Sequence, residues 1–319
     1  MWRLMNKTLV WACVVVFLVA GTAGLAMAKK EVVVGCKNFT EQYIVGQMMK
    51  QILEDRGFEV DLKADLTSMA LRGGLESGDL EICAEYTGTA WMTHLKNEYT
   101  PEMGHMDVFK QVKKMDKKNG YIWLHPIWNN NTYALACWQD FADANGLDSL
   151  SDFAAYCRKN DGKVSTFVDF EFSTRPDGLP ALEEHYDFHI PESHLKTGAP
   201  GASILGLKNK QAKVGMVFGT DAAIAENNWV VLKDDKSFFP PYDLAPCIRD
   251  EVLEEYPEVE DILLELVGSF PGGDQAATSD LVAEAQSVWQ ELNAKVDIEQ
   301  MQPREVAHEY LVEQGLIQE

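Results

Sequence analysis

Basic residues are scarce in this sequence. Its 319 residues include 28 lysines and arginines against 50 aspartates and glutamates, which gives a formal net charge of −22. A surface this acidic repels phosphate backbones and anionic lipid headgroups, so the composition excludes a nucleic-acid-binding protein. The mean field of such a surface favours cations, or zwitterions that present a positive end, although solubility alone would account for the charge equally well.

Catalytic motifs are also missing. The sequence contains no Gly-x-Ser-x-Gly, no His-Glu-x-x-His and no phosphate-binding loop, so it carries none of these signatures of hydrolytic or nucleotide chemistry. Asp169 and Glu171 form a carboxylate pair two residues apart, but no further acid or base accompanies them. We therefore predict a protein that is not an enzyme, with no catalytic residues and no cofactor.

Metal-binding spacings are weak. No two cysteines have the Cys-x-x-Cys spacing, which argues against a structural zinc site and against a thioredoxin-like redox site. His185 and His189 lie four residues apart and could chelate a divalent metal, but Pro191 breaks the spacing before His194. A polar loop is the simpler interpretation of this segment, and we predict no metal site.

Only one long apolar run is present, near the N-terminus. Residues 9–20 are apolar, basic residues precede them, and residues 26–28 have the small-x-small pattern that signal peptidase accepts. We expect residues 1–28 to be a signal peptide cleaved after Ala28, which would make the mature protein periplasmic; an uncleaved anchor is the alternative. Without this segment the chain holds 26 basic and 50 acidic residues, a net charge of −24.

The mature chain keeps five cysteines, an odd count that leaves at least one thiol free. In an oxidising compartment one or two disulfides could form, and equally all five could be small buried core residues. The sequence does not decide between these alternatives. The five residues are Cys36, Cys83, Cys137, Cys157 and Cys247.

The first part of the mature chain alternates between strand and helix patterns. Short apolar runs separate two segments whose apolar residues recur at helical spacing. This order is typical of a βαβαβ unit with a parallel sheet and right-handed crossovers. The expected strands are 32–34, 58–62 and 80–84, and the expected helices are 40–56 and 67–77.

A second α/β alternation follows three asparagines at 129–131. Pro240 and Pro241 later fix φ in a stiff aromatic segment, which suits a strand that returns to the first lobe. We predict a bilobal α/β fold of two doubly wound lobes, the hinge-closing arrangement of type II periplasmic binding proteins. The expected divisions are 29–131 for lobe 1, 132–239 for lobe 2 and 240–319 for the helical return to lobe 1.

Six short motifs carry a resemblance to a known family. They are Lys-Asn-Phe-Thr-Glu-Gln at 37–42, Glu-Tyr-Thr-Gly-Thr at 85–89, Asn-Thr-Tyr-Ala at 131–134, Phe-Ser-Thr-Arg-Pro-Asp-Gly at 172–178, Phe-Gly-Thr-Asp at 218–221 and Phe-Pro-Pro-Tyr-Asp at 239–243. In this order they resemble the OpuAC-type substrate-binding proteins of ABC transporters for glycine betaine, choline and related osmoprotectants. The resemblance covers about residues 31–316.

The resemblance implies a ligand site. In this family a quaternary ammonium group sits in a box of aromatic rings, and a lysine, an arginine and a hydroxyl hold a ligand carboxylate. Carried over position by position, the carboxylate ligands are Lys37, Thr89 and Arg175. The box is Tyr86, Tyr133, Phe218 and Tyr242, with the backbone carbonyl of Asn131 against the methyl groups. Position 218 departs from the usual tyrosine, which removes a hydroxyl but keeps the ring face.

Each of these residues also has a simpler interpretation when taken alone. Aromatic residues at strand ends are often core packing, and Arg175 could form a salt bridge with Asp177 or Glu171. Further aromatic residues are expected to be packing or cleft rim, and we expect Trp128 to be the nearest of them to the ligand. This further set is Phe39, Trp128, Phe170 and Tyr186.

The implied function is that of a periplasmic solute-binding component of an ABC importer. Its expected ligand is glycine betaine, with choline or proline betaine as alternatives, and its expected partners are the membrane permease subunits. We expect a monomer. An exported enzyme on the same scaffold and a sensory binding protein that docks on a receptor are the alternative functions.

Overall fold

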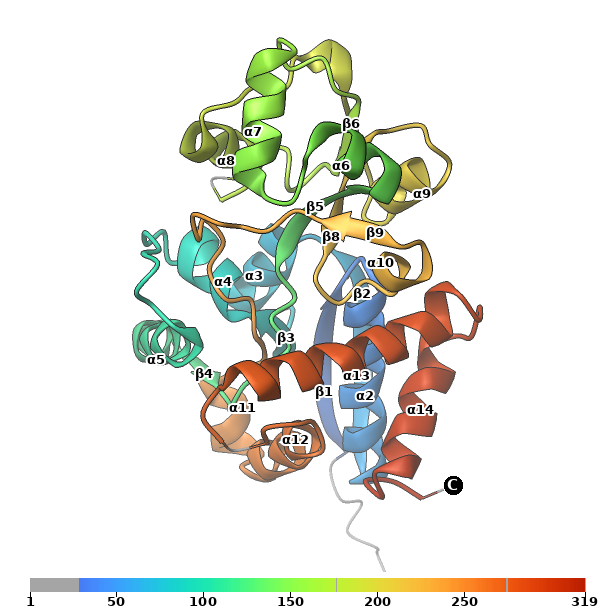
Figure 1. Cartoon of the computed structure of the whole chain (residues 1–319). Helices are drawn as coiled ribbons and strands as arrows, with labels where there is room; N and C mark the ends of the chain where they lie inside the picture. The colour runs from blue at the N-terminus through green and yellow to red at the C-terminus, as the bar shows by residue number, and fades with distance from the viewer. Residues whose placement is uncertain (1–28, 176, 274, 319) are drawn as a thin grey trace, which may run out of the picture. The chain divides into compact units, whose positions relative to one another are not determined.

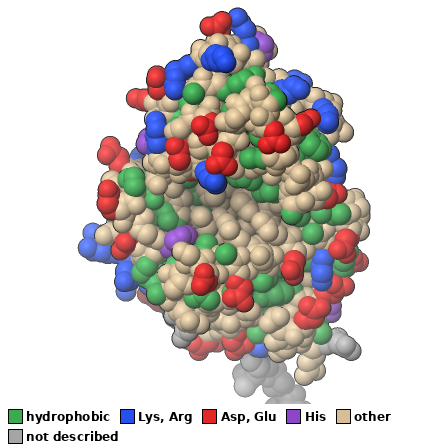
Figure 2. Space-filling view, in the orientation of Figure 1, with side chains coloured by type: hydrophobic (Ala, Val, Ile, Leu, Met, Phe, Trp, Pro, Cys, Tyr) green, Lys and Arg blue, Asp and Glu red, His purple; other side chains and the backbone are tan. Residues whose placement is uncertain are grey.

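The computed structural model describes residues 29–175, 177–273 and 275–318. The predicted signal peptide, residues 1–28, lies outside the described residues. Residues 31–319 form one compact unit. Within the described ranges, no helix combines the length and hydrophobicity needed to cross a membrane. The face drawn in Figure 2 carries acidic side chains over both its upper and its lower part, as the composition leads us to expect.

The first sheet has the strand order β2-β1-β3-β10-β4. Strand β1 pairs with β3 in parallel as predicted, but β10 runs antiparallel to both of its neighbours, so the sheet is mixed. The returning strand β10 begins after the stiff segment that contains Pro240 and Pro241, as the sequence predicts. The strands are β1 (Lys30–Lys37), β2 (Phe58–Leu66), β3 (Ile82–Tyr86), β4 (Tyr121–Trp123) and β10 (Leu244–Arg249).

The second sheet has the order β7-β6-β8-β5-β9. Strand β6 is parallel to β7 and β8, whereas β5 is antiparallel to β8 and β9. The sequence pattern predicts a strand over 163–167, and β6 begins three residues later, at Thr166. The pattern did not predict β7. The strands are β5 (Tyr133–Trp138), β6 (Thr166–Asp169), β7 (Leu195–Gly198), β8 (Val214–Phe218) and β9 (Trp229–Val231).

Helices cover both sheets (Figure 1). In the first half of the chain they are α2 (Thr40–Asp55), α3 (Ser68–Ser77), α4 (Thr87–Thr89), the π-helical turn η1 (Ala90–His94), α5 (His105–Asp116), the 3-10 turn η2 (Lys117–Asn119), α6 (Gln139–Asn145) and α7 (Leu150–Lys159). In the second half they are α8 (Leu179–Tyr186), the 3-10 turn η3 (Glu192–His194), α9 (Ala202–Lys208), α10 (Ala223–Glu226), α11 (Asp250–Glu255), α12 (Glu258–Gly268), α13 (Ser279–Asp297) and α14 (Pro303–Glu313).

Helix α2 illustrates how sequence signals determine an element. Its apolar residues Ile44, Met48 and Ile52 recur at helical spacing and are fully buried. Gly57 follows the helix with φ +90°, a backbone angle that glycine adopts without strain. The C-terminal helices α12, α13 and α14 all pack against α2, so the return of the chain completes the core of the first sheet.

The chain passes from the first sheet to the second between Trp123 and Tyr133, and returns between Val231 and Leu244. We therefore retain 29–131, 132–239 and 240–319 as proposed lobe boundaries. All five cysteines of the described chain are buried free thiols. Two of them, Cys83 and Cys247, lie directly opposite each other on β3 and β10.

Candidate functional site

The eight residues assigned from the resemblance line one pocket. Lys37 and Tyr86 are the last residues of β1 and β3, and parallel neighbours end at the same sheet edge. Tyr133, the first residue of β5, pairs directly with Phe218, the last residue of β8. The pocket leaves a cavity of about 30 Å³. Its lining includes Lys37, Tyr86, Thr89, Asn131, Tyr133, Arg175, Phe218 and Tyr242.

The aromatic rings of this pocket contact one another. The ring centroid of Tyr133 lies 5.2 Å from that of Phe218 and 5.6 Å from that of Tyr242. Tyr86 is not in direct ring contact with this group, because Phe39 lies between: its ring stacks on Phe218 at 5.2 Å and on Tyr86 at 6.1 Å. We call these five rings the aromatic cluster.

Among the further aromatic residues, the choice of Trp128 as the nearest to the ligand was wrong. Trp128 is fully buried, donates its indole N–H to the carbonyl of Gln275 at 2.8 Å, and is absent from the pocket lining. Phe39 takes the place next to the pocket instead. Its position on the turn between β1 and α2, two residues after the assigned Lys37, was the signal that could have identified it.

Charged groups hold the hydroxyls of the three tyrosines. Tyr86 donates to Glu41 at 2.8 Å, and Tyr242 donates to Asp177 at 3.1 Å. The hydroxyl of Tyr133 accepts from Arg175 at 3.0 Å. Because each phenol is anchored at its polar end, the orientation of each ring face is fixed before any ligand arrives.

Glu41 is a buried carboxylate that sequence analysis did not assign. Its Oε1 accepts from Tyr86, from Asn129 at 2.9 Å and from Asn131 at 3.1 Å, and its Oε2 accepts from Thr220 at 2.6 Å. Burial raises the pKa of Glu41 to about 7, although these four hydrogen bonds oppose the shift. The residue therefore connects α2 with the end of β3, with the first crossing segment and with the loop after β8, and its pKa lies near neutral pH.

Lys37 is paired with a carboxylate within the protein. Its Nζ lies 2.5 Å from Oε1 of Glu85 and 5.1 Å from the centroid of the Tyr86 ring. His94 approaches the other carboxylate oxygen of Glu85 at 3.3 Å. Burial by itself raises the pKa of Glu85, but the Lys37 charge and the His94 contact lower it to about 2, so Glu85 stays ionised.

Arg175 has both of the carboxylate partners that its simpler interpretation named. Asp177 accepts from Nε at 2.8 Å and from Nη2 at 2.5 Å, and Glu171 accepts from Nη1 at 3.1 Å. Nη2 also donates to Thr93 at 3.0 Å and to Thr89 at 3.4 Å. A ligand carboxylate that binds Arg175 would have to replace part of this network, so the assigned role of Arg175 remains a prediction.

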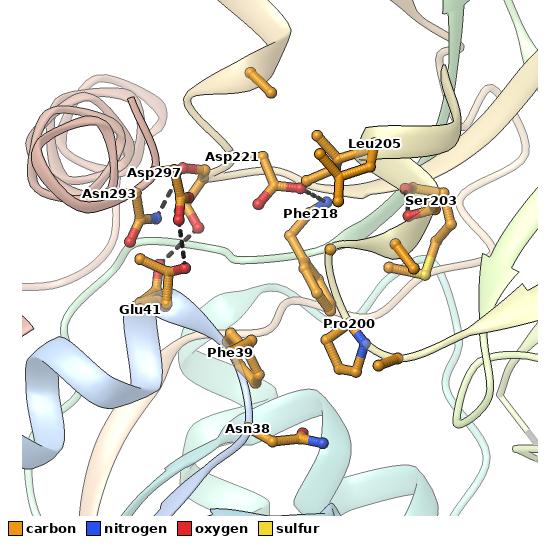
Figure 3. Close-up of a pocket in the computed structure, with 18 of the residues that line it drawn as sticks. Asn38, Phe39, Glu41, Pro200, Ser203, Leu205, Phe218, Asp221, Asn293 and Asp297 are labelled. Atoms are coloured by element: carbon orange, nitrogen blue, oxygen red, sulfur yellow. Dashed lines mark hydrogen bonds between the residues drawn. The ribbon is translucent and has the colours of Figure 1, made fainter. Parts of the chain in front are cut away.

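A second, larger cavity of about 740 Å³ lies on the other side of Phe39 (Figure 3). Carboxylates line it. Asp221 accepts from the backbone N–H of Phe218 at 2.6 Å, and Asp297 accepts from Thr40 at 2.7 Å. Burial, together with the nearby charges of Asp297 and Glu41, raises the pKa of Asp221 to about 7, although the hydrogen bond from the Phe218 backbone opposes the shift.

The alternative that His185 and His189 chelate a metal has no geometric support. In the described ranges no group of three His, Cys, Asp or Glu side chains is arranged to hold a metal ion. His189 instead contacts Glu183 at 3.0 Å, and the ring of His185 lies against that of Tyr186.

Comparisons with known proteins agree with this geometry. Residues 30–313 match the family OpuAC, described as the substrate binding domain of ABC-type glycine betaine transport systems. The chain is 34% identical to a glycine-betaine-binding protein of Pseudomonas aeruginosa, over 98% of this chain and 95% of that protein. It is 31% identical to the glycine betaine-binding protein YehZ of Escherichia coli, over 96% of this chain and 97% of that protein.

The fold has solved counterparts. A crystal structure described as a glycine betaine/carnitine/choline ABC transporter superposes with a TM-score of 0.67 at 24% identity, over 89% of this chain and 99% of that one. At this identity the match concerns the fold alone, which is the bilobal α/β binding-protein fold. With the family match spanning nearly all of the described residues, the chain belongs to the OpuAC family of ABC-transporter substrate-binding proteins.

Proposed function

We propose that this protein is the periplasmic solute-binding component of an ABC importer and that it captures a quaternary ammonium osmolyte, with glycine betaine as the first candidate and choline or proline betaine as alternatives. The observation that carries the proposal is the convergence of Tyr86, Tyr133, Phe218 and Tyr242 on one pocket from four distant parts of the chain. The names of the two relatives, both glycine-betaine-binding proteins, support the same ligand.

Aromatic rings suit this ligand for a physical reason. A trimethylammonium group has no N–H to donate, so hydrogen bonds cannot select it, whereas ring faces attract it through their quadrupoles at ~0.5–2 kcal/mol each. Recognition by rings also avoids the desolvation cost of a buried carboxylate partner for the cation. Together the rings could contribute several kcal/mol, which is sufficient for specific binding.

The carboxylate end of a betaine would be held by Lys37, Thr89 and Arg175. Lys37 and Arg175 are now paired with Glu85 and with Asp177 and Glu171. Binding would therefore be an exchange of partners in which the ligand carboxylate takes over N–H groups from an internal acid. The backbone carbonyl of Asn131 would contact the methyl groups at the ammonium end of the ligand.

A ligand held in this way would bridge the two proposed lobes. Thr89 and Tyr86 lie on the first-sheet side, and Arg175, Tyr133 and Phe218 lie on the second-sheet side. Contacts to both sides would shift the hinge equilibrium toward a closed form, because only the closed form makes all of them. The monomeric closed form would then be recognised by the permease subunits after export and removal of residues 1–28.

Titration calorimetry tests the proposal with glycine betaine, proline betaine, choline and carnitine. We expect heat and saturable one-to-one binding with at least glycine betaine, and binding that persists at raised salt because ring contacts are less sensitive to screening than exposed ion pairs. No heat with any of the four ligands would remove the proposed function. Turnover of a ligand would point to the enzyme alternative.

A further inference from the structure

Phe39 separates the two cavities. Its ring lines both the small pocket of about 30 Å³ and the large cavity of about 740 Å³. Phe218, Asn131, Asn38 and Pro200 are the other residues that line both. Figure 3 shows Phe39 at the start of α2, opposite Phe218 and Pro200, between Asn38 and the carboxylates of the large cavity. The ring is therefore a partition between two spaces.

The ring also occupies the position that a bound cation needs. The plane of the Phe39 ring makes an angle of 26° with that of Tyr86, at a centroid distance of 6.1 Å. It makes an angle of 21° with that of Phe218, at 5.2 Å, so Phe39 is stacked between the two faces. A cation binds a ring face at up to ~6 Å from its centroid. The space between Tyr86 and Phe218 is thus filled by a ring of the protein itself.

The volumes lead to the same conclusion. With Phe39 in place, the small pocket holds about two water molecules, since one water needs ~10–15 Å³ of such volume. A nitrogen surrounded by methyl groups is larger than that. With the two sheets placed as they are, a quaternary ammonium group can enter the aromatic cluster only if a side chain moves. Phe39 and Phe218 are the two cluster members without a ring hydroxyl, and Phe218 is the last residue of β8, whereas Phe39 lies on a turn.

The local structure permits this movement. Phe39 precedes α2 with φ −149° and ψ 162°, so its rotamer is not restricted by a preceding helical turn. Tyr86, Tyr133 and Tyr242 are each held by a hydroxyl hydrogen bond, whereas the ring of Phe39 is held by stacking alone. Its side chain is half-buried, next to the large cavity into which it could rotate.

We propose that Phe39 is a specificity-determining residue that competes with the ligand for the faces of Tyr86 and Phe218, and that its departure joins the aromatic pocket to the large acidic cavity. This inference rests on the proposed function. It adds that the site accepts quaternary ammonium compounds longer than glycine betaine, provided that their far end is uncharged or cationic. Carboxylates impose the second condition, because an anionic end would face Glu41, Asp221 and Asp297. The condition applies above pH 7, where Glu41 and Asp221, whose pKa values are raised to about 7, are ionised.

The remaining charges around the large cavity do not offset these acids. Asp65 and Glu226 also line it, and its lysine, Lys208, is already paired with Glu226 at 3.1 Å. A ligand extension that donates hydrogen bonds would meet carboxylate acceptors, whereas a carboxylate extension would meet like charge in a desolvated space.

The test compares wild type with Phe39→Ala in stopped-flow and calorimetric binding of glycine betaine and of three trimethylammonium probes. The probes share a five-carbon chain and end in a hydroxyl, an ammonium or a carboxylate. We expect Phe39→Ala to raise the association rate of glycine betaine about tenfold, because a competing internal ring no longer reduces the competent fraction. We expect a larger affinity gain for the hydroxyl and ammonium probes than for the carboxylate probe.

Phe170→Ala, which removes an exposed ring outside both cavity linings, is the matched control and should change neither the association rate nor the affinity.

An association rate that is unchanged or lower in Phe39→Ala would overturn the inference, because Phe39 would then be a wall and not a competitor. Equal gains for all three probes would overturn the charge condition. A second measurement keeps the ring and labels it with fluorine. The fluorine NMR signal of 4-fluorophenylalanine at position 39 should shift when glycine betaine is added. A response from the same label at 218 but not at 39 would reject the role of Phe39 while the proposed function stands, whereas silence at both positions with no heat would reject the function itself.

Discussion

The charged side and the aromatic side of the small pocket differ in the partners that their side chains already have within the protein. On the charged side, Lys37 and Arg175 are paired with buried carboxylates. On the aromatic side, hydrogen bonds fix the hydroxyls of Tyr86 and Tyr133 at their edges. The faces of these two rings contact other rings, and they also face the cations of Lys37 and Arg175 at 5.1 and 5.2 Å from the ring centroids. A ligand gains ring contacts by displacing weakly held groups, but it gains ionic contacts only by breaking strong ones.

Because of this difference, the stability of the protein and its affinity for ligand should depend on different residues. Buried ion pairs are costly to break by removal of one partner, because the other charge is then left unpaired. Removal of one ring face weakens the binding of a cation, but it leaves no buried charge unpaired in the protein. We therefore expect substitutions on the charged side to act mainly on stability and substitutions on the aromatic side to act mainly on affinity.

The largest effect is expected for Asp177→Ala. The variant leaves the guanidinium of Arg175 without its bidentate partner and the hydroxyl of Tyr242 without its acceptor. We expect the free energy of unfolding to fall by about 3–5 kcal/mol, measured by denaturant titration. Asp148→Ala removes the exposed pair with Lys233 and should cost less than about 1 kcal/mol. Equal losses in the two variants would show that the buried pairs of Arg175 cost no more to break than an exposed pair, which would contradict the role given to the charged side.

The next effect is the pH dependence of stability caused by Glu41. Its pKa is raised by burial to about 7 in the folded protein, above its usual value of 4.5. The corresponding stabilisation is fully present below pH 4.5 and is lost as pH rises through 7. The free energy of unfolding should fall by an amount on the order of 1–3 kcal/mol between pH 5 and 8, and the melting temperature should fall with it. Glu41→Gln should flatten that slope, and a variant slope identical to wild type would show that Glu41 does not titrate there.

On the aromatic side, Phe218→Ala should lower the affinity for glycine betaine by about 0.5–2 kcal/mol, which is roughly 2- to 30-fold, because one ring face is lost. Phe218→Tyr keeps the face and should bind within a few fold of wild type. Calorimetry measures both affinities. If the alanine and tyrosine variants lost affinity equally, the ring face would not be the recognition element.

The smallest effect is expected for Thr89→Val, which keeps the shape of the side chain and removes its hydroxyl. The hydrogen bond that Thr89 now accepts from Arg175 is long, at 3.4 Å, so the unfolding free energy should change by less than about 1.5 kcal/mol. Affinity for glycine betaine should fall severalfold while affinity for choline, which has no carboxylate, is kept. A loss that affects both ligands equally would contradict the assigned role of Thr89.

Sequence reasoning predicted the elements that have strong local signals. The helical spacing of Ile44, Met48 and Ile52 identified α2, and the resemblance of six motifs identified the family. The pattern did not reveal β7, which is short and lies at the edge of its sheet. Two of its four residues are exposed and the other two are half-buried. Such a strand carries little of the apolar run or alternation on which strand prediction depends.

The same limit applies to the site. The eight assigned positions followed from motif order, but the selection of Trp128 over Phe39 was wrong because proximity across the fold cannot be read from an isolated aromatic residue. The pairing of Arg175 with both Asp177 and Glu171 was visible as a spacing. Its burial and its bonds to Tyr133 and Thr93, which arise from tertiary packing, were not.

The central claim is that ring faces recognise a positive charge and not merely an apolar shape. The most direct measurement compares the affinity of glycine betaine with that of 3,3-dimethylbutanoate, in which a carbon replaces the charged nitrogen and the carboxylate is kept. The account predicts that glycine betaine binds at least about tenfold more tightly, a difference of about 1.4 kcal/mol. Equal binding of the two compounds would contradict it.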